Sequence, residues 1–223
     1  MKRDPEGISR LVVSAALALA LGSCAEREGE EPPVAPALDV PSPASPRDAA
    51  VLAVDGFGEI RIELLADLAP TTVAHFIALA ERDYYDGTTF HRVIPGFMIQ
   101  GGDPNTRDRD PRNDGMGGQH ERVADELPAV SPLRGIVGLA NRGVPNSGGA
   151  QFFILVVDGR HLDGEYAAFG RVTGGLDVVD RIVAVERDVY GRHGPIDRPT
   201  RDVVVSDVRI ERAGARADAA AVP

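Results

Sequence analysis

The sequence is poor in cysteine and in aromatic residues. One cysteine, Cys24, occurs among 223 residues, tryptophan is missing, and aromatic residues make up 5% of the chain. A single cysteine excludes an intramolecular disulfide and a zinc site built from several cysteines. Long apolar runs are missing as well, because no stretch of 18 consecutive apolar residues occurs. This excludes a protein with several transmembrane helices.

Positive charge is also in deficit. The chain has 24 lysines and arginines against 34 acidic residues, a net charge of −10 and a pI near 5.0. Nucleic-acid binding draws much of its affinity from basic groups on phosphates, so we expect no nucleic-acid partner. The apolar fraction of 43% is ordinary for a globular protein. It is enough for the core of one domain with additional segments.

The N-terminal residues have the pattern of an export signal. Three basic residues within the first ten precede an apolar stretch over 11–21. As a helix this stretch would span about 17 Å, short of the roughly 30 Å bilayer core, which favours a signal peptide over an anchor. The sequence LGSC that ends at Cys24 resembles the lipobox of bacterial lipoproteins. We therefore expect 1–23 to be a lipoprotein-type signal peptide and Cys24 to be lipidated; the alternative is a plain signal peptide with an incidental cysteine.

The segment between this signal and the folded domain is rich in proline. Residues 25–48 contain six prolines and no aromatic residue. Such a segment buries little apolar surface, so we expect 24–48 to be a disordered tether. The folded domain is predicted over 49–212, followed by a disordered tail over 213–223. The expected location is the cell envelope, and Ala25 after the cysteine favours the outer membrane, facing the periplasm, in a cell that has one.

Hydrophobic periodicity within 49–212 predicts short strands and two helices. A β-hairpin is expected over 51–64, since apolar and charged residues alternate in its second arm. Apolar residues with helical spacing predict helices over 70–80 and 176–183. Further strands are expected over 136–139, 152–157 and 203–210. This pattern favours a mainly β fold, either a closed antiparallel barrel or a sandwich, over a parallel βαβ protein.

Three segments of the domain carry unusual combinations of residues. They are 90–103 (FHRVIPGFMIQGGD), 138–154, which includes AQFFI, and 161–170 (HLDGEYAAFG). In this order and spacing they closely resemble the cyclophilins, which are peptidyl-prolyl cis-trans isomerases. The resemblance covers essentially all of 50–211. It implies a closed eight-stranded antiparallel β-barrel capped by two α-helices, and isomerisation of X–Pro bonds in unfolded or exported proteins without a cofactor.

The resemblance also implies roles for individual residues. Arg92 resembles the catalytic arginine of the family, with Phe97 and Gln100 beside it. The other residues expected to form the proline pocket or to contact the bound peptide are Met98, Ala140, Asn141, Arg142, Gln151, Phe153, His161, Leu162 and Tyr166. His161 stands where better-known eukaryotic members carry tryptophan, and Tyr166 where they carry histidine. The first difference implies weaker cyclosporin binding.

Ordinary structural roles compete with some of these assignments. Phe152 and Phe153 are neighbours on a predicted strand and must face opposite sides, so we expect Phe152 in the core and Phe153 in the pocket. The five histidines lack the spacing of metal ligands, and no metal site is expected. Ser147 lies outside a GxSxG motif, which gives a serine hydrolase little support.

Two other functions stay open from the sequence alone. A domain with the same pocket and negligible turnover would be a proline-peptide binding module or chaperone of the cell envelope. A structural lipoprotein whose barrel only docks a partner is the more remote alternative. Arg92 favours the enzyme, and we expect it to act as a monomer.

Overall fold

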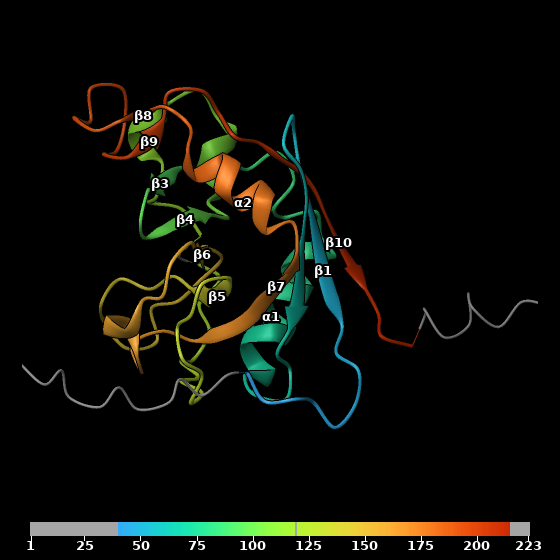
Figure 1. Cartoon of the computed structure of the whole chain (residues 1–223). Coiled ribbons are helices and arrows are strands. Elements are labelled where there is room, and N and C mark those ends of the chain that lie inside the picture. The colour runs from blue at the N-terminus through green and yellow to red at the C-terminus, as the bar shows by residue number, and fades with distance from the viewer. Residues whose placement is uncertain (1–39, 119, 215–223) are drawn as a thin grey trace, which may run out of the picture. The chain divides into compact units, whose positions relative to one another are not determined.

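The computed structural model describes residues 40–118 and 120–214 (Figure 1). The predicted signal peptide, Cys24, the tether up to residue 39 and most of the predicted tail lie outside the described residues. Within the described residues, no helix has the length and apolar character needed to cross a bilayer.

The described residues form strands, two α-helices and three short 3-10 turns. The strands are β1 (Ala49–Val54), β2 (Gly58–Leu64), β3 (Arg92–Ile94), β4 (Met98–Gly101), β5 (Ile136–Leu139), β6 (Phe152–Leu155), β7 (Ala168–Gly174), β8 (Arg187–Asp188), β9 (Arg198–Pro199) and β10 (Val205–Glu211). The helices are α1 (Pro70–Ala80) and α2 (Leu176–Val183), and the 3-10 turns are η1 (Pro104–Arg107), η2 (Pro111–Asn113) and η3 (Arg160–Leu162). The predicted hairpin, both helices and the later strands are thus present.

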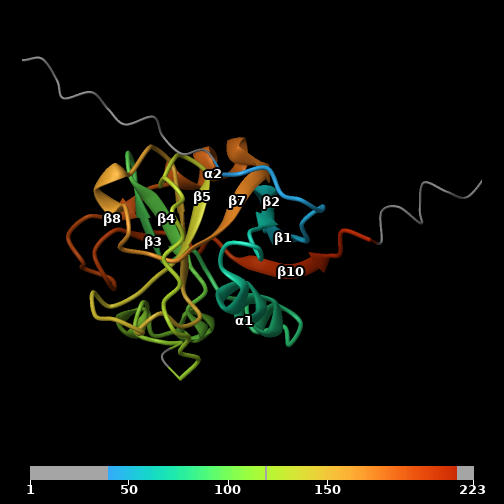
Figure 2. The ribbon, with the colours of Figure 1, turned by 90° about the horizontal axis from the view of Figure 1, so that it is seen from below.

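Eight strands form one antiparallel sheet in the order β10-β1-β2-β7-β5-β6-β4-β3. The sheet curves from β10 and β1 to β3 and β4 (Figure 2). The helices α1 and α2 lie at opposite ends of the curled sheet (Figure 1). The strands β8 and β9 form a separate two-stranded sheet, and β9 contacts β3.

The sheet is open, so the predicted closure of the barrel is wrong. The segments that precede its edge strands, β3 and β10, meet at an isolated bridge between Thr89 and Val204. Backbone hydrogen bonds from Phe90 to Val203 and from Val205 to Thr88 flank this bridge. Because the pairing is antiparallel, the residues that follow Thr89 oppose those that precede Val204. The strands β3 and β10 therefore leave the bridge in opposite directions and form no ladder.

The aromatic core lies between α1 and the concave face of the sheet. Phe76 of α1 contacts Phe152 of β6 with ring centroids 5.9 Å apart, and Phe169 of β7 at 5.1 Å. Phe153 faces the other way, into a second apolar cluster that includes Met98. The alternation predicted for the two neighbouring phenylalanines is therefore present, and it places one phenylalanine in the core and the other at the opposite face of the strand.

The residues that precede β1 lie against the domain. Val40 is 8% exposed and joins the same apolar cluster as Phe153. Arg47 forms ion pairs with Asp67 at 2.7 Å and with Glu63 at 3.2 Å. The last nine residues of the predicted tether, 40–48, thus contact the folded domain.

Two buried polar side chains lie next to β3 and β4. His91 is 2% exposed, and within the described residues neither of its ring nitrogens has a hydrogen-bond partner. Burial lowers the pKa of His91 from 6.5 to about 4, although the charge of Asp103 acts in the opposite direction. The histidine is therefore neutral near pH 7. Asp103 is 0% exposed and accepts hydrogen bonds from the backbone N–H groups of Asn105 at 2.8 Å and Gly117 at 3.1 Å.

A matched pair of leucines tests the core. Leu79 of α1 is 0% exposed, whereas Leu127 is 52% exposed. We expect Leu79→Ala to lower the free energy of unfolding by about 2–5 kcal/mol, because it removes buried methyl groups and leaves a cavity. Leu127→Ala should change it by less than about 0.5 kcal/mol. Urea unfolding of both variants measures this, and equal losses would contradict the described packing.

The buried histidine predicts a pH dependence of stability. Between pH 6.5 and about 4 the unfolded chain binds a proton at His91 that the folded chain does not, so stability falls as the pH falls. The neutral, buried His91 contributes on the order of 3 kcal/mol to the pH dependence of the free energy of unfolding over this range. The variant His91→Gln lacks this titration, and its stability should fall less than that of the wild type over this range.

Urea unfolding at pH 7, 5.5 and 4.5 measures the difference. His193→Gln, which replaces an exposed histidine, is the control. Parallel pH profiles of the wild type and His91→Gln would show that His91 does not carry this dependence.

Candidate active site

A small cavity of about 180 Å³ lies where β3, β4 and β6 meet the loops that follow β5 and η3. The residues that line it are Arg92, Phe97, Met98, Gln100, Ala140, Asn141, Phe153, Leu162 and Tyr166. All nine belong to the set of site residues predicted from the sequence. The fold thus gathers residues from three separate segments of the chain around one cavity.

Strand register positions the polar groups of this cavity. Arg92 of β3 lies opposite Gln100 of β4, and Gln100 lies opposite Phe153 of β6. The Arg92 guanidinium donates a hydrogen bond to Oε1 of Gln100 at 3.3 Å. No carboxylate in the described part of the chain forms an ion pair with Arg92, whose charge is therefore available to a ligand.

A second glutamine fixes the first. Gln100 donates through Nε2 to Oε1 of Gln151 at 2.9 Å. Nε2 of Gln151 in turn donates to the carbonyl oxygens of Gly117 at 2.9 Å and Gly115 at 3.0 Å. It also lies 3.4 Å from a carboxylate oxygen of Asp103. This chain of amides holds the Gln100 oxygen toward Arg92 and ties both to the loop after η2.

The walls of the cavity are apolar. Met98 is 2% and Phe153 7% exposed, so each presents only a small surface to the cavity. The ring of Tyr166 meets that of Phe153 edge to face with centroids 5.2 Å apart. Such walls suit a compact apolar ring such as that of proline.

The loop after β5 borders the cavity through Ala140 and Asn141. The Asn141 side chain is engaged on both sides, since Nδ2 donates to the carbonyl of Glu165 at 3.1 Å and Oδ1 accepts from the N–H of Gly143 at 2.9 Å. The side chain thereby fixes the loop beside the cavity.

A second, smaller cavity of about 90 Å³ adjoins the first. The two cavities share Gln100, Ala140 and Asn141. Two further predicted residues, Arg142 and Gln151, line the second cavity. Its remaining lining residues were not predicted as site residues and are Gly115, Gly117, Gly118, Ser147, Gly149 and Ala150. The glycines carry no side-chain chemistry, so only their clustering in the sequence could have pointed to them.

His161 is the one predicted residue outside both linings. Its ring lies over Phe97 with centroids 5.6 Å apart and an interplanar angle of 38°. It therefore supports a wall of the cavity from outside. The first cavity combines apolar walls with the Arg92 guanidinium, which forms no ion pair among the described residues. No His, Cys, Asp or Glu cluster in the described residues could hold a metal ion.

Comparison with known proteins gives the same family along the whole domain. Residues 50–214 match the model of the family described as cyclophilin type peptidyl-prolyl cis-trans isomerase/CLD. The chain is 46% identical over 140 residues to peptidyl-prolyl cis-trans isomerase-like 1 of Rhizopus delemar, which covers 60% of this chain and 80% of that protein. It is 38% identical over 160 residues to peptidyl-prolyl cis-trans isomerase-like 3 of Gallus gallus, a match that covers 69% of this chain and 90% of that protein.

One longer relative and one solved structure complete the comparison. Against peptidyl-prolyl cis-trans isomerase-like 2 of Cryptococcus neoformans the identity is 38% over 161 residues, and the match spans 26% of that protein. The crystal structure of a cyclophilin type isomerase of Cryptosporidium parvum, obtained in the presence of the dipeptide Ala-Pro, superposes with a TM-score of 0.64 at 29% identity. It covers 73% of this chain and 98% of that one. The chain therefore belongs to the cyclophilin-type peptidyl-prolyl cis-trans isomerase family.

Proposed function

We propose that this protein isomerises X–Pro bonds in exported polypeptides, with Arg92 as the catalytic group. The observation that carries the proposal is the Arg92 guanidinium at the edge of an apolar cavity, held by Gln100 and without a carboxylate partner among the described residues. Proline-containing peptides are the ligand class, as for the Cryptosporidium parvum relative crystallised in the presence of Ala-Pro.

The chemistry requires no bond cleavage. Rotation about the X–Pro bond removes amide resonance, at a barrier of roughly 18–20 kcal/mol. In the twisted state the prolyl nitrogen becomes pyramidal and gains a lone pair. A guanidinium N–H aimed at this nitrogen binds the twisted state more strongly than the planar one, and this difference is what lowers the barrier.

Magnitudes indicate that the arginine does not act alone. A charge-assisted hydrogen bond contributes about 1.5–3 kcal/mol, which corresponds to roughly one to two powers of ten in rate. The apolar walls contribute the rest by holding the proline ring while the preceding carbonyl turns. Arginine suits this role better than lysine, because its planar guanidinium is always charged and has fixed donor directions.

Export and lipid anchoring form the second part of the proposal. The support is the basic start, the short apolar stretch and the position of Cys24 directly after it. The relatives named above are eukaryotic proteins, so this part rests on the N-terminal residues of this chain alone. An anchored isomerase would act on clients in the envelope, where slow proline isomerisation limits folding.

Replacing the arginine tests catalysis. We expect Arg92→Ala to lower kcat/KM for an Xaa-Pro tetrapeptide by about 10-fold to 100-fold, because the donor to the prolyl nitrogen is lost. A protease-coupled assay measures this, and circular dichroism checks the fold. Arg181→Ala, which removes an arginine paired with Asp177 on the surface of α2, should keep full activity.

Two results would contradict this assignment. Wild-type activity in Arg92→Ala would remove the catalytic role of the arginine. A wild-type protein that binds the tetrapeptide without accelerating its isomerisation would instead be the proline-peptide binding module.

Replacing the cysteine tests the anchor. In cells grown with labelled palmitate, the full-length protein should carry the label and fractionate with membranes, because lipidation of Cys24 supplies acyl chains. Cys24→Ser should lose the label and leave the membrane fraction. Label that persists in Cys24→Ser would overturn the proposed site of lipidation.

A further inference from the structure

The loop that holds Gln151 is itself held by a buried ion pair. Gly115, whose carbonyl oxygen accepts from Gln151 at 3.0 Å, directly follows Asp114 in the chain. Oδ2 of Asp114 accepts from Nε of Arg198 in β9 at 2.6 Å. The side chains of Asp114 and Arg198 are 2% and 17% exposed. The ion pair therefore ties the loop after η2 to β9.

The residue before Arg198 is bonded to the strand that carries Arg92. The backbone N–H of Val93 in β3 donates to the carbonyl oxygen of Asp197 at 2.9 Å. The carboxylate of Asp197 accepts from Nε of Arg187 in β8 at 2.9 Å. The start of β9 is thus fixed between β8 and β3, next to the catalytic arginine proposed above.

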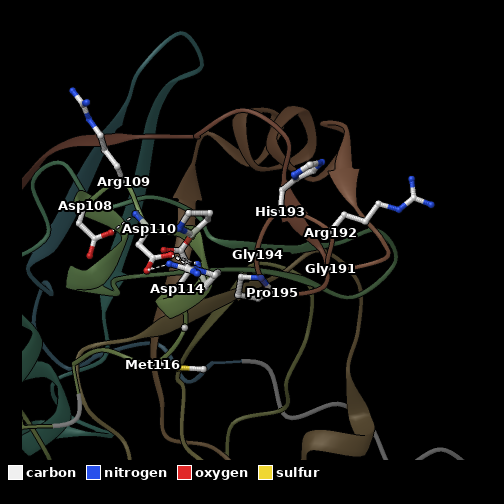
Figure 3. Close-up of a pocket in the computed structure, with 13 residues that line it drawn as sticks. Asp108, Arg109, Asp110, Asp114, Met116, Gly191, Arg192, His193, Gly194 and Pro195 are labelled. Carbon is white, nitrogen blue, oxygen red and sulfur yellow. Dashed lines mark hydrogen bonds and ion pairs between the residues drawn. The ribbon is translucent and has the colours of Figure 1, made fainter.

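The loop between β8 and β9 also lies against the segment that contains Asp114. Figure 3 shows the segment 108–116 and the loop 191–195 on two sides of a cavity of about 1100 Å³. A Cβ at Gly194 would lie 2.9 Å from the carbonyl oxygen of Pro111 and 2.9 Å from Cδ of Arg198. The two segments are therefore in close contact beside the ion pair, and a side chain at position 194 would push them apart.

These contacts close a ring that begins and ends at Arg92. In order, its members are Arg92, Gln100, Gln151, Gly115, Asp114, Arg198, Asp197 and Val93. Each link is a hydrogen bond, an ion pair or a peptide bond. A displacement of the ion pair would therefore move both the amides that orient the guanidinium and the strand that carries it.

A buried ion pair fixes geometry more than it stabilises a fold. The cost of removing two charges from water offsets their attraction, so such a pair adds little net stability. Its charge-assisted hydrogen bonds are nevertheless short and directional. Arg198 also donates to the carboxylate of Asp202 at 2.7 Å, which holds the guanidinium from a second side. The place of Asp114, and with it that of the loop, is thereby defined.

We propose that Asp114 and Arg198 are positioning residues for the isomerase reaction, because their ion pair places the loop after η2 and thereby directs the Arg92 guanidinium toward the prolyl nitrogen. This inference rests on the proposed function and adds two residues that do not line the cavity of about 180 Å³. Arg92 acts on the twisted state, so a misdirected guanidinium lowers kcat and leaves KM unchanged.

Removal of both charges tests this inference. The double variant Asp114→Leu with Arg198→Met replaces the pair by apolar side chains and leaves no unpaired buried charge, so the fold should persist. We expect kcat for the Xaa-Pro tetrapeptide to fall by about threefold to tenfold, and KM to stay within about twofold of the wild type. Combined with Arg92→Ala, the double substitution should lower kcat no further, because it acts through Arg92.

A second variant answers the same question if the apolar pair does not fold. Arg198→Lys keeps the positive charge beside Asp114 but lacks the planar fork of donors that bridges Asp114 and Asp202. We expect it to lower kcat by at least about twofold with KM unchanged. Thermal unfolding and circular dichroism check the fold of every variant.

Two control variants separate positioning from a general loss of charge. Asp114→Asn keeps an oxygen that accepts from Nε of Arg198, so its kcat should stay within about twofold of the wild type. Arg209→Met breaks an ion pair with Glu59 at 2.9 Å on β10, at the other edge of the sheet from β3. It should keep the wild-type kcat.

The orientation of Arg92 can also be followed without turnover. The ¹H–¹⁵N resonance of its Nε is identified by its loss in Arg92→Ala. We expect this resonance to shift in the apolar double variant and in Arg198→Lys, and to keep its position in Asp114→Asn and Arg209→Met.

The outcomes separate this inference from the proposed function. The positioning role is overturned if the folded variants of the pair keep the wild-type kcat, if they leave the Arg92 resonance in place, or if they raise KM instead. An equal loss of kcat with and without Arg92→Ala also overturns it. If the wild type does not isomerise the tetrapeptide, the proposed function fails, while the Arg92 resonance still decides whether the ion pair positions the guanidinium.

Discussion

The site depends on an arginine that is held by a neutral partner. Many other arginines of this acidic chain form ion pairs with carboxylates, as Arg198 does with Asp114 and Arg47 with Asp67. Arg92 instead donates to the amide oxygen of Gln100. A carboxylate at that place would compete with the weak lone pair of a twisted prolyl nitrogen for the same donors. A glutamine orients the guanidinium and leaves its charge unneutralised, which is the condition for stabilising the twisted state.

This choice of partner also explains features at some distance from the cavity. Gln100 keeps its orientation because Gln151 accepts from it, and Gln151 is fixed by the carbonyl oxygens of Gly115 and Gly117. The loop must therefore come close to the sheet. A Cβ at Gly117 would lie 2.1 Å from a carboxylate oxygen of Asp103, so only glycine fits there. Gly117 thus allows the backbone of this loop to come close to Asp103 and Gln151.

Local patterns predicted the elements that carry their own periodicity. The alternation in β2 and the helical spacing in α1 were sufficient to predict these elements. In both, the apolar residues recur at the spacing that places them on one buried face. The gap between the edge strands β3 and β10 could not be predicted from local patterns. It depends on how the two strands run in opposite directions from one bridge. The ribbon of β8 and β9 was missed because each strand has two residues and Asp188 fixes the intervening loop by accepting backbone N–H groups of Tyr190 and His193.

The candidate site residues were predicted by resemblance and not by periodicity, and the size of the cavity limits what they can contact. The cavity of about 180 Å³ has room for little more than one ring and its neighbours, so it cannot distinguish one proline-containing client from another by its own contacts. Discrimination must come from residues further along the client chain, where the flanking side chains differ. The proposed catalytic arginine, at the edge of this cavity, would meet the prolyl nitrogen in the same way in every client.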